Sequence, residues 1–154
     1  MEIRSFKTND TFALIELFRK TVHTVCSQDY SQEQLEAWAP KEIDENKWTA
    51  RFEQSFTLVA EDSRRVVGFV NLELDGGIDM FYVAADYQSR GVGKQLLGAL
   101  EKEARHRGFE KLYSDVSLTA RSFFLSKGFH VEKEYSKTVG SVVFPNAVMV
   151  KKLS

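Results

Sequence analysis

Cysteine, histidine and long apolar runs are scarce in this sequence, and each shortage excludes a class of protein. The single Cys26 cannot form an internal disulfide, and His23, His106 and His130 have no metal-ligand spacing with it. No stretch approaches the roughly 18 to 20 apolar residues that span a bilayer, and the N-terminus carries no apolar signal region. We therefore expect no metal and no membrane contact, and a reducing, cytoplasmic compartment.

An excess of charge of one sign is also missing. The 21 Lys and Arg side chains nearly balance 22 Asp and Glu, which gives a formal net charge of -1 at pH 7. No sequence-wide field favours nucleic acid, so we expect no nucleic-acid partner. What is present is an apolar content of 43% in 154 residues, with twelve Phe, enough for a real core. Without a linker, repeat or low-complexity tract, the sequence predicts one domain over residues 1–154.

The N-terminal third predicts a short strand followed by three helices. The strand covers 3–6, and Asp10 is expected to cap the first helix. Ser31 and Gln34 have the spacing of a capping box for a second helix, which Pro40 ends. A third, shorter helix is expected before the next strand.

From residue 56 the apolar period changes to that of strands and then alternates. The predicted order is strands at 56–61, 66–74 and 78–83, a helix from 92 ending before Gly108, a strand at 111–116, a helix at 119–126 and two strands after it. A turn at Asp75-Gly76-Gly77 joins the second and third of these strands. The whole pattern, β, three helices, βββ, α, β, α, ββ, predicts an α+β fold.

The segment between the strand ending near Val83 and the following helix predicts an anion site. Backbone N–H groups at a helix N-terminus have no intrahelical partners, and they attract negative charge. Gly91 and Gly93 remove Cβ atoms where phosphates would approach the backbone, and Arg90 and Lys94 add positive charge. A pyrophosphate would be held well here.

Two better-known phosphate motifs do not fit these residues. A P-loop requires Gly where Gln88 stands and Ser or Thr where Gln95 stands, and a dinucleotide fingerprint requires Gly at Leu96. The remaining pattern is Q/R-x-x-G-x-G/A, within the run Phe81-Tyr82-Val83-Ala84-Ala85-Asp86-Tyr87-Gln88-Ser89-Arg90-Gly91-Val92-Gly93-Lys94-Gln95-Leu96-Leu97. With the later Ala120-Arg121-Ser122-Phe123-Phe124-Leu125-Ser126-Lys127-Gly128-Phe129, the chain resembles the GNAT superfamily of N-acetyltransferases.

The resemblance implies a three-layer α/β/α fold and a reaction. The central sheet would be mixed, mostly antiparallel, with about seven strands and helices on both faces. Residues 56–154 would form the acetyl-CoA-binding core, and residues 1–55 the variable helices on the acceptor side. The enzyme would transfer acetyl from acetyl-CoA to a small-molecule or peptide primary amine in a direct ternary complex, as a monomer or as a homodimer paired through a strand edge at 147–153.

The family pattern also assigns residues to acetyl-CoA. Backbone N–H groups of the Gln88–Lys94 segment would hold the pyrophosphate, and the strand at 81–83 would pair with the pantetheine arm. In this interpretation a backbone N–H near Val83 polarises the acetyl carbonyl, in a gap between two parallel strands. Lys127 either reaches the 3′-phosphate or neutralises a helix C-terminus. The implied set is Phe81, Tyr82, Val83, Gln88, Ser89, Arg90, Gly91, Val92, Gly93, Lys94, Phe124 and Lys127.

Phe124 marks a departure from the family pattern. Many members have a Tyr at this position, close to the CoA sulfur, and phenylalanine cannot protonate the leaving thiolate. Ser117, Tyr113 and Tyr135 are candidate replacements. The same departure supports an alternative function, a CoA-binding or regulatory module with little or no turnover.

Glu73 and Asp79 are the candidate general bases, and the hairpin loop decides how they relate. A two-residue turn puts them on opposite faces, whereas a three-residue loop makes them direct partners; Glu73 is the preferred base. On the acceptor side, Tyr30, Trp38 and His23 are candidate pocket residues, although aromatic residues at helical spacing also pack cores. The acceptor amine itself stays open.

Overall fold

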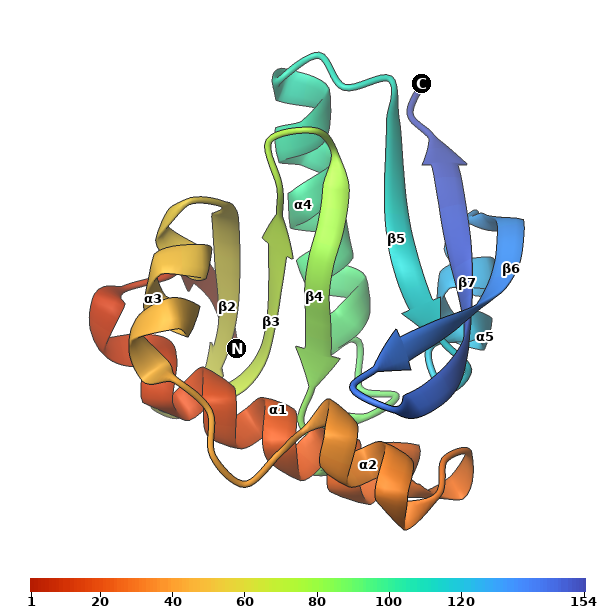
Figure 1. The fold of residues 1–154 in the computed structure, drawn as a ribbon. Coiled ribbons are helices and arrows are strands. Elements are labelled where there is room, and N and C mark those ends of the chain that lie inside the picture. Colours follow the sequence, from red (N-terminus) through yellow and green to blue (C-terminus); the bar gives the residue numbers. More distant parts are fainter.

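The computed structural model describes residues 1–154 and contains one seven-stranded sheet (Figure 1). The strand order is β1-β2-β3-β4-β5-β7-β6, and only the β4–β5 pair is parallel. The strands are β1 (Glu2–Ser5), β2 (Phe56–Asp62), β3 (Arg65–Leu72), β4 (Gly77–Val83), β5 (Lys111–Ser117), β6 (His130–Val139) and β7 (Val142–Lys152). The helices are α1 (Thr11–Val25), α2 (Gln32–Trp38), α3 (Glu45–Glu53), α4 (Val92–His106) and α5 (Arg121–Ser126), with single 3-10 turns η1 (Thr8–Asp10), η2 (Cys26–Gln28) and η3 (Ala85–Tyr87). The predicted fold class and element order are confirmed.

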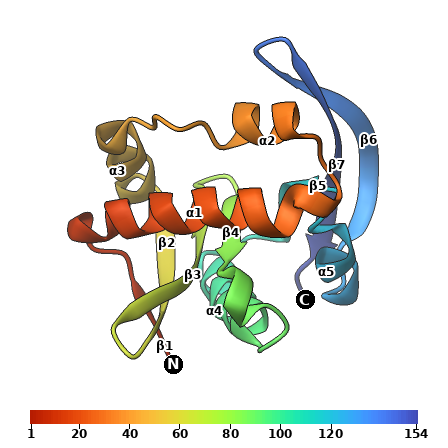
Figure 2. The ribbon, with the colours of Figure 1, turned by 90° about the horizontal axis from the view of Figure 1, so that it is seen from below.

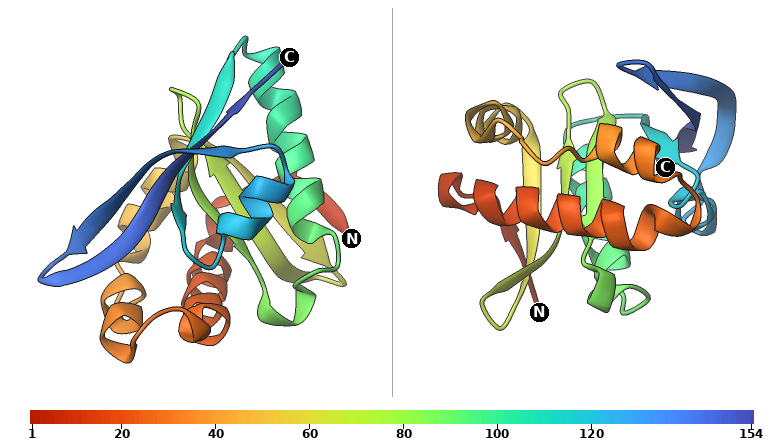
Figure 3. Two further views of the ribbon diagram at one scale, coloured as in Figure 1. Left: turned by 90° about the vertical axis from the view of Figure 1, so that its right-hand side faces the viewer. Right: turned by 60° about the horizontal axis from the view of Figure 1, so that its bottom comes forward.

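The sheet separates two layers of helices. The helices α4 and α5 lie on one face, and α1, α2 and α3 lie on the other (Figure 3). The apolar stripe predicted for α4 is buried, since its five members are at most 2% exposed: Val92, Leu96, Leu97, Leu100 and Ala104. A Cβ at Gly68 of β3 would lie 3.0 Å from both Val92 and Leu96, so this glycine permits α4 to approach the sheet closely.

Most residues predicted to start or end a helix do so in the structure. Ser31 Oγ accepts from Gln34 N, and Ser31 N donates to Gln34 Oε1, which is the predicted capping box of α2. Gly108 follows α4 with φ +80°, the left-handed conformation that ends helices. None of the helices combines the length and the apolar character that crossing a membrane requires.

Two sequence-based expectations are wrong. Asp10 immediately precedes α1, but its side chain makes no capping bond because Arg4 and the Lys7 backbone occupy it. The strand at 147–153 is no sheet edge, because β7 pairs with β5 on one side and β6 on the other. The edge strands are β1 and β6, so β7 has no unpaired strand edge with which a second chain could pair.

Asp10 instead anchors β1 to the start of α1. It accepts two hydrogen bonds of 2.9 Å from Arg4 and one of 2.7 Å from Lys7 N. Burial opposes ionisation of the Asp10 carboxyl, but these donors outweigh burial and hold its pKa below the ordinary value. Its stabilising effect is therefore present above the unfolded-state pKa of about 3.9 and is lost as the pH falls through the lower native value.

Replacing Asp10 by Asn is expected to lower the free energy of unfolding at pH 7 by about 2 kcal/mol, because charge-assisted hydrogen bonds are lost. Urea unfolding at pH 7 and pH 3 measures this change. The deficit of the variant should shrink at pH 3, where the wild-type carboxyl is losing its charge. Glu16→Gln is the control, since the exposed Glu16–Arg19 pair contributes about 0.5 kcal/mol or less; equal losses in both variants would contradict the role of Asp10.

Candidate active site

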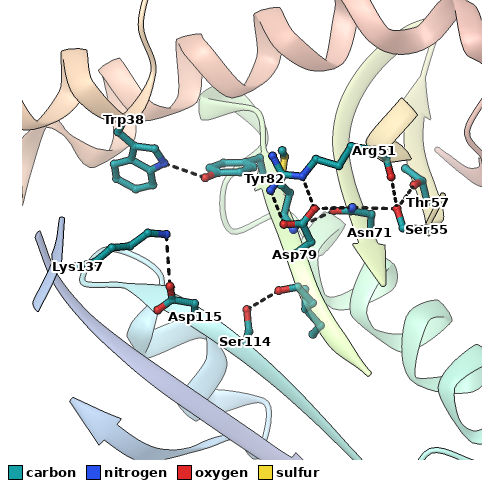
Figure 4. Close-up of polar contacts among 12 residues, drawn as sticks. Trp38, Arg51, Ser55, Thr57, Asn71, Asp79, Tyr82, Ser114, Asp115 and Lys137 are labelled. Atoms are coloured by element: carbon teal, nitrogen blue, oxygen red, sulfur yellow. Dashed lines mark hydrogen bonds and ion pairs between the residues drawn. The ribbon is translucent and has the colours of Figure 1, made fainter. Parts of the chain in front are cut away.

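The parallel strands β4 and β5 separate and leave a V-shaped gap in the sheet. They pair only at Gly77 with Tyr113 and Ile78 with Ser114, and then diverge (Figure 1). At the point of separation Ser114 Oγ donates to the Ile78 carbonyl over 3.0 Å (Figure 4). The Ser114 hydroxyl thus takes the Ile78 carbonyl, which a backbone N–H of β5 would bond if the two strands stayed paired.

The edge of β4 that faces this gap carries free backbone donors. Ala84 N donates to Val67 O on the β3 side, and Tyr82 stands opposite Phe69 in the same ladder. Because N–H directions alternate along a strand, the N–H groups of Phe81 and Val83 point toward β5 instead. There β5 has already diverged, so these groups can bind an extended ligand.

The N-terminus of α4 opens beside the same gap. Gly91 has φ +85° and Ser89 has φ +60°, and no side chain caps the first turn of the helix. A Cβ at Gly93 would lie 3.1 Å from the Phe123 ring, so a larger residue here requires that ring to shift. First-turn N–H groups without partners, under a backbone kept clear of side chains, fit a pyrophosphate.

A single cavity of about 1260 Å³ joins these features. One end is lined by Gln88, Ser89, Gly91, Gly93, Lys94 and Lys127, and the opposite end by Glu73, Asp79, Trp38 and the aromatic residues around them. The gap between β4 and β5 lies between the two ends. Lys94 and Lys127 thus lie where phosphates would bind, and the carboxylate of Glu73, which forms no ion pair, lies at the other end.

Asp79 lies at a β-bulge and is fully engaged by neighbours. Asn71 pairs with Met80 and Leu72 with Ile78, so Asp79 has no single partner on β3. Its carboxylate accepts from Arg51 through Nε and Nη2 and from Asn71 Nδ2 (Figure 4). Asp79 therefore serves as the partner of a guanidinium and is poorly placed to take a proton.

Glu73 has the opposite character. The hairpin closes with Glu73 N donating to Gly77 O over 2.8 Å, so a three-residue loop is found, but it covers 74–76 and not Asp75-Gly76-Gly77. Glu73 therefore stands opposite Gly77 and is no direct partner of Asp79. The Glu73 side chain lines the cavity and has no hydrogen-bond partner in the protein. Burial, followed by the nearby charges of Asp79 and Asp75, raises the pKa of its carboxyl. Such a group can accept a proton from a bound amine.

Aromatic side chains from the α2 region cover the acceptor side. Tyr30 and Trp38 both line the cavity, with ring centroids 5.2 Å apart. Trp38 Nε1 donates to Tyr82 Oη over 3.2 Å (Figure 4), which ties α2 to β4. His23 is placed elsewhere: its Nε2 lies 2.9 Å from the Ala39 carbonyl at the end of α2, and it does not line the cavity.

Comparison with known proteins gives the family. The model of the acetyltransferase (GNAT) domain family matches residues 26–150. The chain belongs to the GNAT acetyltransferase family. It is also 33% identical over 149 residues to the uncharacterized N-acetyltransferase YafP of Escherichia coli (strain K12), covering 97% of this chain and 94% of YafP.

Solved structures agree with this GNAT assignment. A GCN5-related N-acetyltransferase from Rhodopseudomonas palustris, also described as an aminotransferase of class II, is 35% identical with a TM-score of 0.94, over 99% of this chain and 95% of that one. The PaiA N-acetyltransferase from Thermoplasma acidophilum, in complex with coenzyme A, is 25% identical with a TM-score of 0.81, over 98% of both chains. The protein is an acyltransferase of the N-acetyltransferase type.

Phe124 is buried in an aromatic cluster of this GNAT fold. It is 4% exposed, and its ring lies 5.8 Å from Phe81 and 5.0 Å from Phe129. The side chain therefore forms part of the apolar floor beside β4. It carries no proton to donate.

The three hydroxyls considered for that role are placed differently. Tyr113 donates to Asp75, which raises its pKa to about 12, and Tyr135 donates to Asp115, with burial and that carboxylate raising its pKa to about 12. Tyr113 and Ser117 line the cavity, but Tyr135 does not. Ser117 Oγ accepts from Ala120 N at the turn into α5.

The remaining assigned residues surround the α4 N-terminus without all facing the cavity. Arg90 does not line it, and its guanidinium lies 4.3 Å from the centroid of the Tyr87 ring. Val92 is buried beneath the helix, 2% exposed. No group of three or more His, Cys, Asp or Glu side chains is arranged to hold a metal ion.

Sequence reasoning missed several polar residues of the site. Arg51 of α3 and Asn71 of β3 fix Asp79, and Lys137 pairs with Asp115 over 3.4 Å on the opposite wall (Figure 4). One signal was present, because Asn71 interrupts an otherwise apolar strand and is 0% exposed. A buried amide in such a strand needs partners, which points to a polar neighbour.

Proposed function

We propose that this chain transfers the acetyl group of acetyl-CoA to a primary amine by direct attack within a ternary complex. The observation that carries the proposal is the gap between β4 and β5, with an anion site at one end of its cavity and an unpaired carboxylate at the other. The YafP relative and the coenzyme A complex of PaiA support the choice of donor. The buried Cys26, whose pKa burial raises to about 11, is a poor nucleophile and supports direct transfer.

Each end of the cavity has a role in this reaction. The first-turn N–H groups of α4, with Lys94, would bind the pyrophosphate, and the exposed edge of β4 would pair with the pantetheine amides. The N–H of Phe81 or Val83 would stabilise the developing oxyanion of the acetyl carbonyl. Such fixed backbone donors are already oriented before the substrate arrives, so they reorganise little during the reaction.

The acceptor side favours a positively charged amine before it loses its proton. Arg51 pairs with Asp79 and Lys137 with Asp115, whereas Glu73 forms no ion pair. An ammonium group would therefore be drawn to Glu73. The same carboxylate would then remove the proton that blocks the nitrogen lone pair.

Thermal unfolding with acetyl-CoA, followed by thiol release with a panel of amines, tests the function. Ligand at 100 times its Kd should add about 2.7 kcal/mol of stability, which raises Tm by about 5–10 °C for a chain of this size. Stabilisation with turnover supports the transferase. Stabilisation without turnover for any amine favours a CoA-binding or regulatory module, and no shift in Tm contradicts both.

A further inference from the structure

Amine attack on a thioester expels a thiolate, and the cavity must supply the proton that this sulfur finally carries. The inference below rests on the proposed function. A thiol pKa of about 8.5 makes the thiolate a tolerable leaving group, so a proton donor would assist the reaction without being indispensable. The residue sought is a hydroxyl that faces the cavity and whose proton is not already used.

Most hydroxyls around the gap are excluded by their own hydrogen bonds. Ser114 donates to the Ile78 carbonyl and Tyr113 to Asp75, so their protons are committed. Tyr135 donates to Asp115 and lies outside the cavity. Ser117 is an aliphatic alcohol, which is a much weaker acid than a phenol.

Tyr30 is a phenol that receives a hydrogen bond and donates none within the protein. Its Oη accepts from Leu118 N over 2.7 Å, and the side chain lines the cavity while the residue is only 7% exposed. The ring is fixed between Trp38, at 5.2 Å, and Phe144, at 6.0 Å. An N–H donor that points at the oxygen stabilises the phenolate that remains after proton transfer.

Tyr30 also lies at the open end of the gap. The helix α1 crosses beneath the carboxyl ends of β4 and β5 (Figure 2). Thr21 Oγ1 donates to Val83 O at the end of β4, and Tyr30 contacts Leu118, the residue after β5. The segment that starts at Leu118 leads into α5, which carries Phe124. The hydroxyl therefore lies at the end of β5, in the same cavity that Phe124 lines.

Tyr82 is the other phenol with an unused proton, and its position is less suitable. Its Oη accepts from Trp38 Nε1, and its ring packs edge-on against Phe18 of α1 at 5.0 Å. It therefore faces the helix layer above β4. Tyr30 is held by the backbone beside β5, on the side toward which the gap opens.

We propose that Tyr30 donates the proton that the CoA sulfur takes up when the acyl group leaves. The amine nitrogen forms a bond to the acetyl carbon as the C–S bond breaks. The electron pair of the C–S bond goes to sulfur, which binds the proton from Tyr30 Oη. The attacking amine is neutral, because Glu73 has already removed its ammonium proton and passed that proton to solvent. Glu73 then takes the second proton, which the nitrogen loses as the amide forms. Tyrosinate and protonated Glu73 then exchange protons with solvent, which restores both groups for the next cycle.

The first test is Tyr30→Phe, with kcat for thiol release and Kd for acetyl-CoA measured on the intact chain. We expect kcat to fall about 10-fold, because general acid assistance is lost while the thiolate remains a tolerable leaving group, and Kd to stay within about 2-fold. Tyr82→Phe is the comparison, and a smaller loss of kcat is expected there. A larger loss in Tyr82→Phe, or an unchanged kcat in Tyr30→Phe, overturns the proposal. Wild-type protein that binds acetyl-CoA but turns over no amine refutes the transferase function instead.

A second measurement is independent of turnover. Ultraviolet titration of CoA bound to the protein reports the pKa of its thiol, which a donated hydrogen bond from Tyr30 should hold lower in the wild type than in Tyr30→Phe. The ionisable groups near Tyr30 are Cys26 and Asp29 on its own segment; Trp38, Phe144 and Leu118, which contact it from other elements, carry none.

Difluorotyrosine at position 30 keeps the ring and the hydroxyl, so it serves where Tyr30→Phe fails to fold. Burial raises the pKa of Tyr30 in the natural chain, so kcat should lack an alkaline limb in the neutral range. The fluorinated phenol should bring that limb to lower pH, whereas a structural role would leave the profile unchanged. An unchanged profile, or an equal pKa for the CoA thiol in wild type and Tyr30→Phe, overturns the proposal.

Discussion

Replacing Glu73 by Gln is expected to lower kcat/KM for amine acetylation about 100-fold or more, which is the usual range for removing a general base. The Glu73 carboxylate lines the cavity without a hydrogen-bond partner, and burial with the charges of Asp79 and Asp75 raises its pKa. Glutamine keeps the size of the side chain and cannot accept the proton. Steady-state kinetics over a range of pH measures the loss.

The pH profile separates a base from a residue that merely shapes the pocket. Without Glu73, the enzyme depends on the fraction of amine that is already deprotonated, so the deficit should narrow as the pH rises toward the amine pKa. Asp79→Asn is the comparison, because it breaks the Arg51 pair and should lower Tm as well as activity. Full activity in Glu73→Gln together with a large loss in a folded Asp79→Asn would reverse the two assignments.

The parts of the site that sequence could predict depend on residues close together in the chain. The α4 stripe repeats with helical period, and Gly91 and Gly93 follow from the needs of a helix N-terminus that binds phosphate. The capping box of Ser31 and Gln34 is likewise a pattern of neighbours. The structure confirms the α4 stripe and the capping box, because each is determined by local backbone geometry, and phosphate binding at Gly91 and Gly93 stays a prediction.

The remaining features depend on contacts that no local pattern encodes. The engagement of Asp79 requires a bulge in β4 and the docking of Arg51, which is 28 residues away. Tyr30 accepts a hydrogen bond from Leu118, which is 88 residues away in the chain. The sequence could therefore predict Tyr30 as a pocket residue, but not the position of its hydroxyl. His23 shows the opposite error, since a polar side chain expected in a pocket bonds a helix-end carbonyl instead.

Reversing the charge of Lys94 tests the anion site and is expected to have a large effect on acetyl-CoA affinity. Lys94→Glu should raise the Kd for acetyl-CoA about 100-fold, because a like charge beside the phosphates costs several kcal/mol. Isothermal titration measures the change, and the loss should shrink at high salt, where charges are screened. The substitution leaves the fold intact, since an acidic residue near a helix N-terminus is favourable by about 0.3–1 kcal/mol.

Lys102→Glu is the matched control, because it makes the same change of charge on the same helix. Lys102 is exposed and lies in the later turns of α4, away from the cavity that Lys94 lines. Its Kd should stay within about 2-fold of the wild type, since a distant exposed charge is screened. Equal losses in the two variants would mean that overall charge governs binding. A loss confined to Lys94→Glu would place the phosphates at the first turn of α4, where no side chain caps the free N–H groups.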